Sequence, residues 1–361
     1  MIRATFGELM SRLRAEGVAT DDDVAAVRTA LRASDDAEMP VYLRALVGFG
    51  AWIATILLVA FFYALRLLDD KTTAVIFGVV LIGGAAWLRR RSRGEFTRHA
   101  AVAASFAGQG LILTAIEMFS PRDAVPFIAA ALMSLVMIVL MPDVLHRFVS
   151  AVILVGSVAA ALVAVNASHA LDIAALMAVV ALAWVWRVDV HRRSDDLTEM
   201  FTPVGYGLAI GLFGLCLFGA FYSMVEGART HAPNFGALTT YGVGLMLSAL
   251  VLVILREHDT TPSGFAGVTM LVIIALFAAL TLKSPGIICG AGMLILGFDR
   301  KNIALMELAT AFLIVFGAAN YYSLNLTLLE KSGVLVASGV LLIVARAFVA
   351  RLPGARAEAS S

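Results

Sequence analysis

Residues 89–98 read Arg89-Arg90-Arg91-Ser92-Arg93-Gly94-Glu95-Phe96-Thr97-Arg98. Five arginines fall within these ten residues, and the segment on either side is apolar and long enough to enter a bilayer. Arginine is costly to move through lipid, and the lysine and arginine content of short loops sets the orientation of membrane helices. We therefore predict that this loop lies on the cytoplasmic side, which gives every other segment of the chain a direction.

The composition of the whole chain indicates a polytopic helical membrane protein. Hydrophobic residues make up 61% of the 361 residues and charged residues 15%, and the mean hydropathy is +0.91. Soluble domains have an apolar share nearer half and a charged share of about 25%. The net charge of +1 hides a strong segregation of charge into the loops. Because no basic surface with interleaved aromatic residues is evident, nucleic acid is not an expected partner.

Twelve segments are long and apolar enough to be spans, since a hydrocarbon core of about 30 Å needs about 20 apolar residues. They cover about 43–66, 72–88, 99–119, 123–141, 146–166, 169–187, 201–223, 235–255, 264–282, 285–298, 302–321 and 328–348. With both termini cytoplasmic, 21 of the 27 lysines and arginines lie on the cytoplasmic side. We therefore expect an all-α protein with about twelve transmembrane helices. The tenth span is short, and whether it crosses fully or re-enters is left open.

The two ends of the chain differ from the apolar region between them. Residues 1–40 are predicted to form a short cytosolic helical hairpin, because Phe6, Leu9 and Leu13 recur at helical spacing before Gly17. This hairpin is either an assembly appendage or a docking site for a cytosolic partner. Residues 41–349 form the multi-span domain, and residues 350–361 are predicted to be a disordered tail.

Two polar side chains inside the spans form a candidate intramembrane polar site. Glu307 lies in the eleventh span, little more than one turn from its cytoplasmic end, so it either reaches the interface or serves as a proton or cation site. Gln109 lies in the third span, where an interhelical hydrogen bond is its expected role. Asp172 belongs with charges near the outer span ends, which are explained by capping and solvation or by a shared vestibule.

Glycines are concentrated in two spans. Gly207 and Gly211 have a four-residue spacing in the seventh, and Gly286 and Gly290 lie in the tenth after Pro285. Small residues allow helices in lipid to approach closely, whereas a short segment interrupted by Pro and Gly marks some transport sites. Close packing is the favoured interpretation for both.

The motifs of common enzymes and metal sites are not found in this sequence. There is no Walker A loop, no His-Glu-x-x-His and no Gly-x-Ser-x-Gly. None of the six histidines has another at the spacing of a helical metal site. Cys216 and Cys289 lie within apolar runs and are interpreted as packing residues. We therefore expect no catalytic residues, no cofactor and no metal.

One run near the C-terminus is distinctive: Tyr321-Tyr322-Ser323-Leu324-Asn325-Leu326-Thr327-Leu328-Leu329-Glu330-Lys331-Ser332. Its tyrosines suit an aromatic belt at the outer interface, and Thr327 with Glu330 three residues later forms a capping box. We call five residues of this run, Tyr321, Tyr322, Thr327, Glu330 and Lys331, the outer-loop signature. Together with Pro40-Val41-Tyr42-Leu43-Arg44-Ala45-Leu46-Val47-Gly48-Phe49-Gly50-Ala51-Trp52, it resembles an uncharacterised family of bacterial integral membrane proteins, domain of unknown function 4401. The resemblance implies a bacterial inner-membrane location and supplies no activity or substrate.

Two functions follow as hypotheses. The first is a structural, assembly or partner-binding component of a membrane complex, with membrane lipids and another membrane protein as partners. The second is a transporter or lipid-handling channel with a polar site near Glu307 and Gln109, by analogy with twelve-span transporters only.

Overall fold

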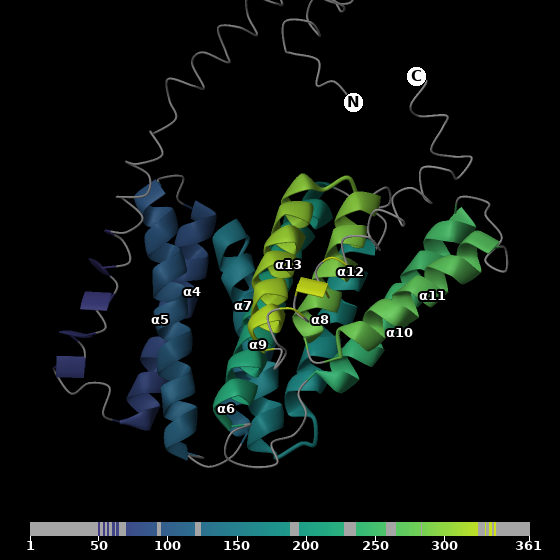
Figure 1. Ribbon diagram of the computed structural model, residues 1–361. Helices are drawn as coiled ribbons and strands as arrows, with labels where there is room; N and C mark the ends of the chain where they lie inside the picture. Colours follow the sequence, from purple (N-terminus) through teal and green to yellow (C-terminus); the bar gives the residue numbers. More distant parts are fainter. Residues whose placement is uncertain are drawn as a thin grey trace, which may run out of the picture. The chain divides into compact units, whose positions relative to one another are not determined.

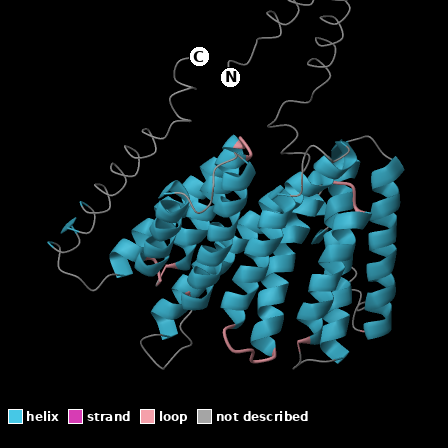
Figure 2. Cartoon of the chain, turned by 90° about the vertical axis from the view of Figure 1, so that its right-hand side faces the viewer, coloured by secondary structure: helices cyan, strands magenta, loops and turns pink. Residues whose placement is uncertain are grey.

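The computed structural model describes residues 70–91, 95–119, 124–187, 195–226, 236–257, 265–282 and 284–323, with scattered residues between 50 and 64 and between 329 and 336. Every regular element in these ranges is an α-helix (Figure 2). The chain divides into two compact units, Met1–Ala115 and Ile116–Ser361, which are described one at a time.

Ten α-helices lie in the described ranges, and Figure 1 labels them along the chain. They are α4 (Lys71–Arg91), α5 (Glu95–Phe119), α6 (Val125–Leu140), α7 (Val144–Ala164), α8 (Ala170–Arg187), α9 (Asp195–Glu226), α10 (Ala237–Glu257), α11 (Phe265–Leu280), α12 (Pro285–Asp299) and α13 (Ile303–Ser323). The predicted second to eleventh spans each coincide with one of them. The hairpin at 1–40 and the tail at 350–361 lie outside the described residues, as does most of the first and twelfth spans.

Six described helices are long and apolar enough to cross a membrane, namely α4, α5, α7, α8, α9 and α13. The apolar parts of α6, α10, α11 and α12 are shorter. A helix suits lipid because it makes its backbone hydrogen bonds within its own segment. The described chain is therefore that of an all-helical, multi-pass membrane protein.

In the first unit, α4 and α5 pack as an antiparallel hairpin through two glycines. A Cβ atom on Gly78 would lie 2.8 Å from the carbonyl oxygen of Gly108, and one on Gly108 would lie 2.9 Å from Cγ1 of Ile82. Asp70 directly precedes α4, and its carboxylate accepts hydrogen bonds from the backbone N–H (2.9 Å) and hydroxyl (3.0 Å) of Thr73. These bonds favour the charged form and lower the pKa of Asp70. The result is an exposed helix cap.

In the second unit, contacts between helices fix their relative directions. Gly207 of α9 faces Phe148 and Ala151 of α7, and Gly211 faces Val155 further along, so α7 and α9 are parallel. Helices α8 and α10 are parallel as well. Asp172 in the first turn of α8 contacts Thr239 in the first turn of α10, and further along both helices Leu176 packs against Gly242. Helices an even number of spans apart therefore run the same way in both pairs.

Helix α9 lies at the centre of the second unit, where it contacts α6, α7, α8, α12 and α13. Its Phe213 packs edge-on against Phe312 and Phe316 of α13, with ring centroids 4.7 and 5.5 Å apart. Both α13 rings are almost fully buried. Such aromatic pairs contribute about 0.5–1.5 kcal/mol beyond their buried area. They attach α13 to the centre of the unit.

Candidate functional site

An apolar groove of about 730 Å³ lies beside α7 and α9. Most of its lining belongs to these two helices, and α6 and α8 contribute Phe127 and Leu171. The floor is formed by small residues: no atom lies within 4 Å of a Cβ built on Gly156 or on Gly214. Ligand sites typically measure about 300–1,000 Å³ and have mainly apolar walls. This space, which we call the α7–α9 groove, therefore has the size and chemistry to hold an apolar partner.

The glycines of α9 divide between packing and the groove. A Cβ on Gly207 would lie 2.7 Å from Cβ of Ala151, and one on Gly211 would lie 2.9 Å from Cβ of Val155. These two glycines therefore allow α9 to approach α7 closely, which confirms the packing interpretation. Gly214, less than one turn later, faces the open groove instead. The same run of small residues thus joins the two helices and leaves space beside them.

The glycines of α12 have a packing role as well. A Cβ on Gly286 would overlap the ring of Phe316, and one on Gly290 would lie 3.0 Å from Cβ of Phe312. Pro285 occupies the start of the helix, where its missing N–H costs no hydrogen bond, and α12 then continues to Asp299. The Pro–Gly segment therefore does not break the helix. It brings α12 into close contact with α13.

A buried carboxylate links α8 to the start of α10. Oδ1 of Asp172 accepts hydrogen bonds from the backbone N–H groups of Gly236 and Thr239, each at 3.0 Å, and from the Thr239 hydroxyl at 2.5 Å. The other oxygen, Oδ2, lies 3.5 Å from Nδ1 of His169. A negative charge at a helix N-terminus satisfies donors that have no partner within the helix and interacts favourably with the helix dipole. The capping part of the prediction for Asp172 is therefore confirmed, with α10 as the capped helix. The expected solvation is wrong, because the Asp172 side chain is buried.

At its other end, α8 meets α12 through an ion pair. Arg187 Nη1 lies 3.5 Å from Oδ2 of Asp299, and Arg300 Nε lies 3.4 Å from the same oxygen. Arg300 Nη2 also donates to the backbone carbonyl of Arg187 at 3.2 Å. All three charged side chains are mostly buried. Because the last residues of α8 and α12 meet here, these two helices also run the same way.

A second polar contact joins α9 to α13 at the same end. Tyr206 donates its hydroxyl hydrogen to Oδ1 of Asn302 at 2.9 Å, and this oxygen also accepts the N–H of Leu305 at 3.0 Å as a cap of α13. The ring of Tyr206 packs edge-on against Trp186, with centroids 5.3 Å apart. Here partly buried polar groups connect one helix to another.

Glu307 and Gln109 lie in different units, so the structure does not test them as one site. Glu307 is exposed on α13, and the described ion pairs of Arg300 and Asp299 do not include it. Gln109 is buried in α5, where Nε2 donates to the Ser105 hydroxyl at 3.4 Å, one turn earlier. The polar site predicted at these two residues therefore stays a proposal.

The outer-loop signature falls largely outside the described residues. Tyr321 is half-buried in the last turn of α13, and the backbone of Tyr322 is helical. Thr327, Glu330 and Lys331 are not described, so the predicted aromatic belt and capping box stay predictions.

One buried polar pair was missed by the sequence reasoning. The Ser150 hydroxyl lies 3.2 Å from Nδ1 of His146, and both side chains are fully buried one turn apart in α7. The four-residue spacing of His146 and Ser150 in the sequence is the signal that could have identified this pair. Among the described residues, no group of three or more His, Cys, Asp or Glu side chains is placed to hold a metal ion.

Comparison with known proteins supplies a family and no activity. No curated protein and no solved structure matches the chain. The model of one family, described as "Domain of unknown function (DUF4401)", matches residues 40–352, which include every described helix. Because this match extends over most of the chain, the protein belongs to the DUF4401 family of domains of unknown function.

Proposed function

We propose that this protein is a multi-pass component of the bacterial inner membrane that crosses the bilayer about twelve times and keeps both termini in the cytoplasm. The distribution of lysine and arginine supports this topology. The parallel pairs α7 with α9, α8 with α10 and α8 with α12 also support it, because the members of each pair are two or four helices apart along the chain, as alternating crossings require. Residues 1–40 would form the cytosolic hairpin, 41–349 the multi-span domain and 350–361 a disordered tail.

The short helix α12 is proposed to be a full crossing. At its start, Pro285 lies beside Gly236, which donates its N–H to Asp172 near the start of α8. At its end, Asp299 pairs with Arg187, the last residue of α8. Helix α12 therefore covers nearly the same depth as α8, which is long and apolar enough to span a membrane. Its 15 residues correspond to about 22 Å of helix.

Labelling of single cysteines tests this crossing. In a chain whose own cysteines are replaced by serine, we expect Lys283→Cys to react with a membrane-impermeant maleimide from the outer side. Lys301→Cys is expected to react only after the membrane is permeabilised. Lys71→Cys and Arg93→Cys serve as outer and inner reference positions. Reaction of Lys283→Cys and Lys301→Cys from the same side would show that α12 re-enters.

We further propose that the protein is a structural or assembly component that binds another membrane protein through the α7–α9 groove. The single observation that carries this proposal is the combination of about 730 Å³ of apolar space with a glycine and alanine floor. In lipid, association depends on close packing, and small residues allow the backbones to approach. Described polar groups of the second unit, such as Asp172 and Asn302, are engaged in contacts between helices of that unit. The groove thus offers shape and apolar contact to a partner helix.

Filling the groove should abolish partner binding without unfolding the protein. Gly214→Leu places a side chain in open space, and leucine is a better helix former than glycine by nearly 1 kcal/mol in peptide hosts. We expect a photo-crosslinker at Phe127, in the groove wall, to form a stoichiometric adduct with another membrane protein. Gly214→Leu should remove most of that adduct and leave the melting temperature unchanged or higher.

Gly317→Leu is the matched control, because a Cβ there also meets open space but lies outside the groove. An unchanged protein adduct in Gly214→Leu would refute binding in the groove. Adducts with phospholipid alone would favour the second candidate function, a lipid-handling channel, which is supported by the same apolar cavity.

The second candidate function also includes a transporter, whose polar site would be formed by Glu307 and Gln109. If Glu307 carries a coupling proton or cation, Glu307→Gln should abolish transport while membrane levels stay normal. Retention of activity in this variant would eliminate the idea.

A further inference from the structure

The open face of α4 carries an apolar stripe that ends in arginine. One face of this helix is buried, and it consists of Ala74, Gly78, Ile82 and Ala85. On the other side Ile76, Val80 and Trp87 are 57%, 62% and 60% exposed, and their spacing of four and seven residues places them in one line along the helix. A Cβ on Gly84, between Val80 and Trp87, would meet no atom within 4 Å. We call Ile76, Val80, Gly84, Trp87 and Arg91 the α4 stripe.

Positive charge is concentrated where the α4 stripe ends. Arg90 and Arg91 are exposed in the last turn of α4. The guanidinium carbon of Arg91 lies 5.4 Å from the ring centroid of Trp87, one turn earlier, which is a cation–π contact. Residues 89–98 hold five arginines and one acid, Glu95, so this segment has a formal charge of +4. A surface with such an excess of positive charge attracts anions.

We propose that the α4 stripe binds an anionic phospholipid of the phosphatidylglycerol class. Its phosphate would lie at Arg90 and Arg91, because guanidinium groups form bidentate hydrogen bonds to phosphate oxygens. Trp87 would lie at headgroup level, where tryptophan is enriched, and an acyl chain would follow Val80 and Ile76 past the open space at Gly84. From Ile76 to Arg91 the helix rises about 22 Å, which matches one leaflet of a bilayer about 40–45 Å thick.

Charge selects an anionic lipid over a zwitterionic one. The phosphate of phosphatidylcholine is followed by a quaternary ammonium group, which the positive charge of residues 89–98 would repel. Aromatic rings can bind such ammonium groups, but the guanidinium of Arg91 already occupies such a position over Trp87. A headgroup that has a phosphate and no cation meets neither obstacle.

Helix orientation and the helix dipole account for only part of this arrangement. Both favour positive charge at this end of α4, and lysine would serve them as well as arginine does. Neither requires a tryptophan in contact with the arginine at the end of an open apolar stripe. A bound anionic lipid explains the arginines, the tryptophan and the stripe together.

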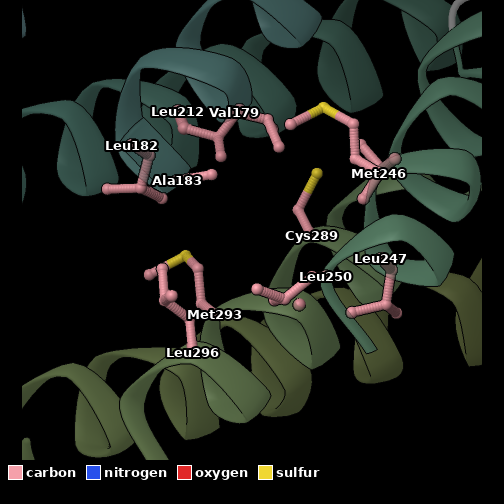
Figure 3. Close-up of a pocket in the computed structure, with 12 residues that line it drawn as sticks. Val179, Leu182, Ala183, Leu212, Met246, Leu247, Leu250, Cys289, Met293 and Leu296 are labelled. Carbon is pink, nitrogen blue, oxygen red and sulfur yellow. The ribbon is translucent and has the colours of Figure 1, made fainter. Parts of the chain in front are cut away.

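Two cavities of the second unit are unsuited to a charged headgroup. The cavity among α8, α9, α10 and α12 measures about 50 Å³, and the side chains drawn around it in Figure 3 are apolar or sulfur-bearing. The α7–α9 groove is lined by apolar residues as well. An unpaired charge is very unfavourable in such surroundings. The headgroup site on α4 is therefore separate from the groove that is proposed to bind a partner.

Photo-crosslinking of the full-length protein tests the proposal, in nanodiscs of equal amounts of phosphatidylglycerol and phosphatidylcholine. A benzoylphenylalanine placed at Val80, an exposed position of the α4 stripe, reports which lipid lies beside it. We expect phosphatidylglycerol to be enriched at least about fivefold in the adducts, the preference that one arginine confers near an anionic lipid. In the double variant Arg90→Gln with Arg91→Gln, three arginines of the loop remain to maintain its orientation. Its adducts should contain the two lipids in nearly equal amounts.

A second double variant separates bidentate binding from charge. Arg90→Lys with Arg91→Lys retains the positive charge and loses the planar fork, so the enrichment should be reduced but not abolished. Equal enrichment in this variant and in the unchanged protein would overturn the site, because charge alone would then explain the preference.

The matched control carries the same crosslinker at Leu132 of α6. Leu132 is 58% exposed, and its helix has no basic residue in the last turn, so we expect both lipids in equal amounts. Three further results would each overturn the proposal: equal amounts of both lipids at Val80 in the otherwise unchanged protein, undiminished enrichment in the glutamine variant, or adducts at Val80 with protein in place of lipid. Nanodiscs offer the same lipids in both leaflets, so the result depends neither on the topology nor on partner binding in the α7–α9 groove.

Discussion

Asp172→Ala is expected to lower the free energy of unfolding by at least about 3 kcal/mol, since each buried donor left without an acceptor costs about 1–3 kcal/mol. Three donors lose their acceptor in this variant, namely the N–H groups of Gly236 and Thr239 and the Thr239 hydroxyl. Because the Asp172 side chain is buried, solvent water does not readily take its place as the acceptor for these donors. The start of α10 should therefore separate from α8, and the melting temperature in detergent should fall by many degrees.

Three further variants make the Asp172 result specific. Asp172→Asn retains an acceptor oxygen without the charge, so its loss of stability should be smaller. Asp70→Ala is the matched control, because Asp70 also caps a helix but is exposed to solvent. In the double variant Asp172→Ala with Thr239→Val, part of the lost stability should be recovered, because the Thr239 hydroxyl, one of the three donors left without an acceptor, is removed. A melting temperature of Asp172→Ala equal to that of the unchanged protein would contradict the assigned role.

Gly286→Ala is expected to destabilise the protein by about 1–3 kcal/mol, the usual cost of inserting a methyl group into a full core. The added Cβ would overlap the ring of Phe316, which is held between Phe312 and Phe213 and has little space to move. Helix packing in lipid depends on such close contacts, because burial from water does not hold the helices together. Resistance to unfolding by SDS measures the effect directly.

The Gly286 result has a positional control and a rescue. Gly317→Ala adds the same methyl group to α13 where no atom lies within 4 Å, so it should be neutral or slightly stabilising. In a Phe316→Ala background the ring is absent, and Gly286→Ala should then cost almost nothing, a coupling of about 1 kcal/mol or more. Equal effects of Gly286→Ala and Gly317→Ala would show that α12 and α13 do not pack as described.

The helical spans are the part of the fold that the sequence predicts well. Ten of the twelve predicted segments coincide with described helices, including the short α12. The small-residue interpretation of Gly207 and Gly211 is confirmed, yet the spacing of these glycines did not identify α7 as their partner. For Asp172 the capping role was anticipated, whereas its donors lie 64 and 67 residues away. The sequence reasoning therefore recognised local roles and not the partners.

By itself, the sequence determined which segments are helical and apolar enough to cross a membrane, and to which family the chain belongs. Each membrane helix satisfies its own backbone hydrogen bonds, so length and hydropathy within one segment are sufficient. Only the tertiary structure decided that Asp172 caps α10, that Gly286 packs against Phe316, and that a groove opens beside α7 and α9. Lipid is as apolar as the helices and does not choose between neighbours, so these pairings depend on the fit of side chains far apart along the chain.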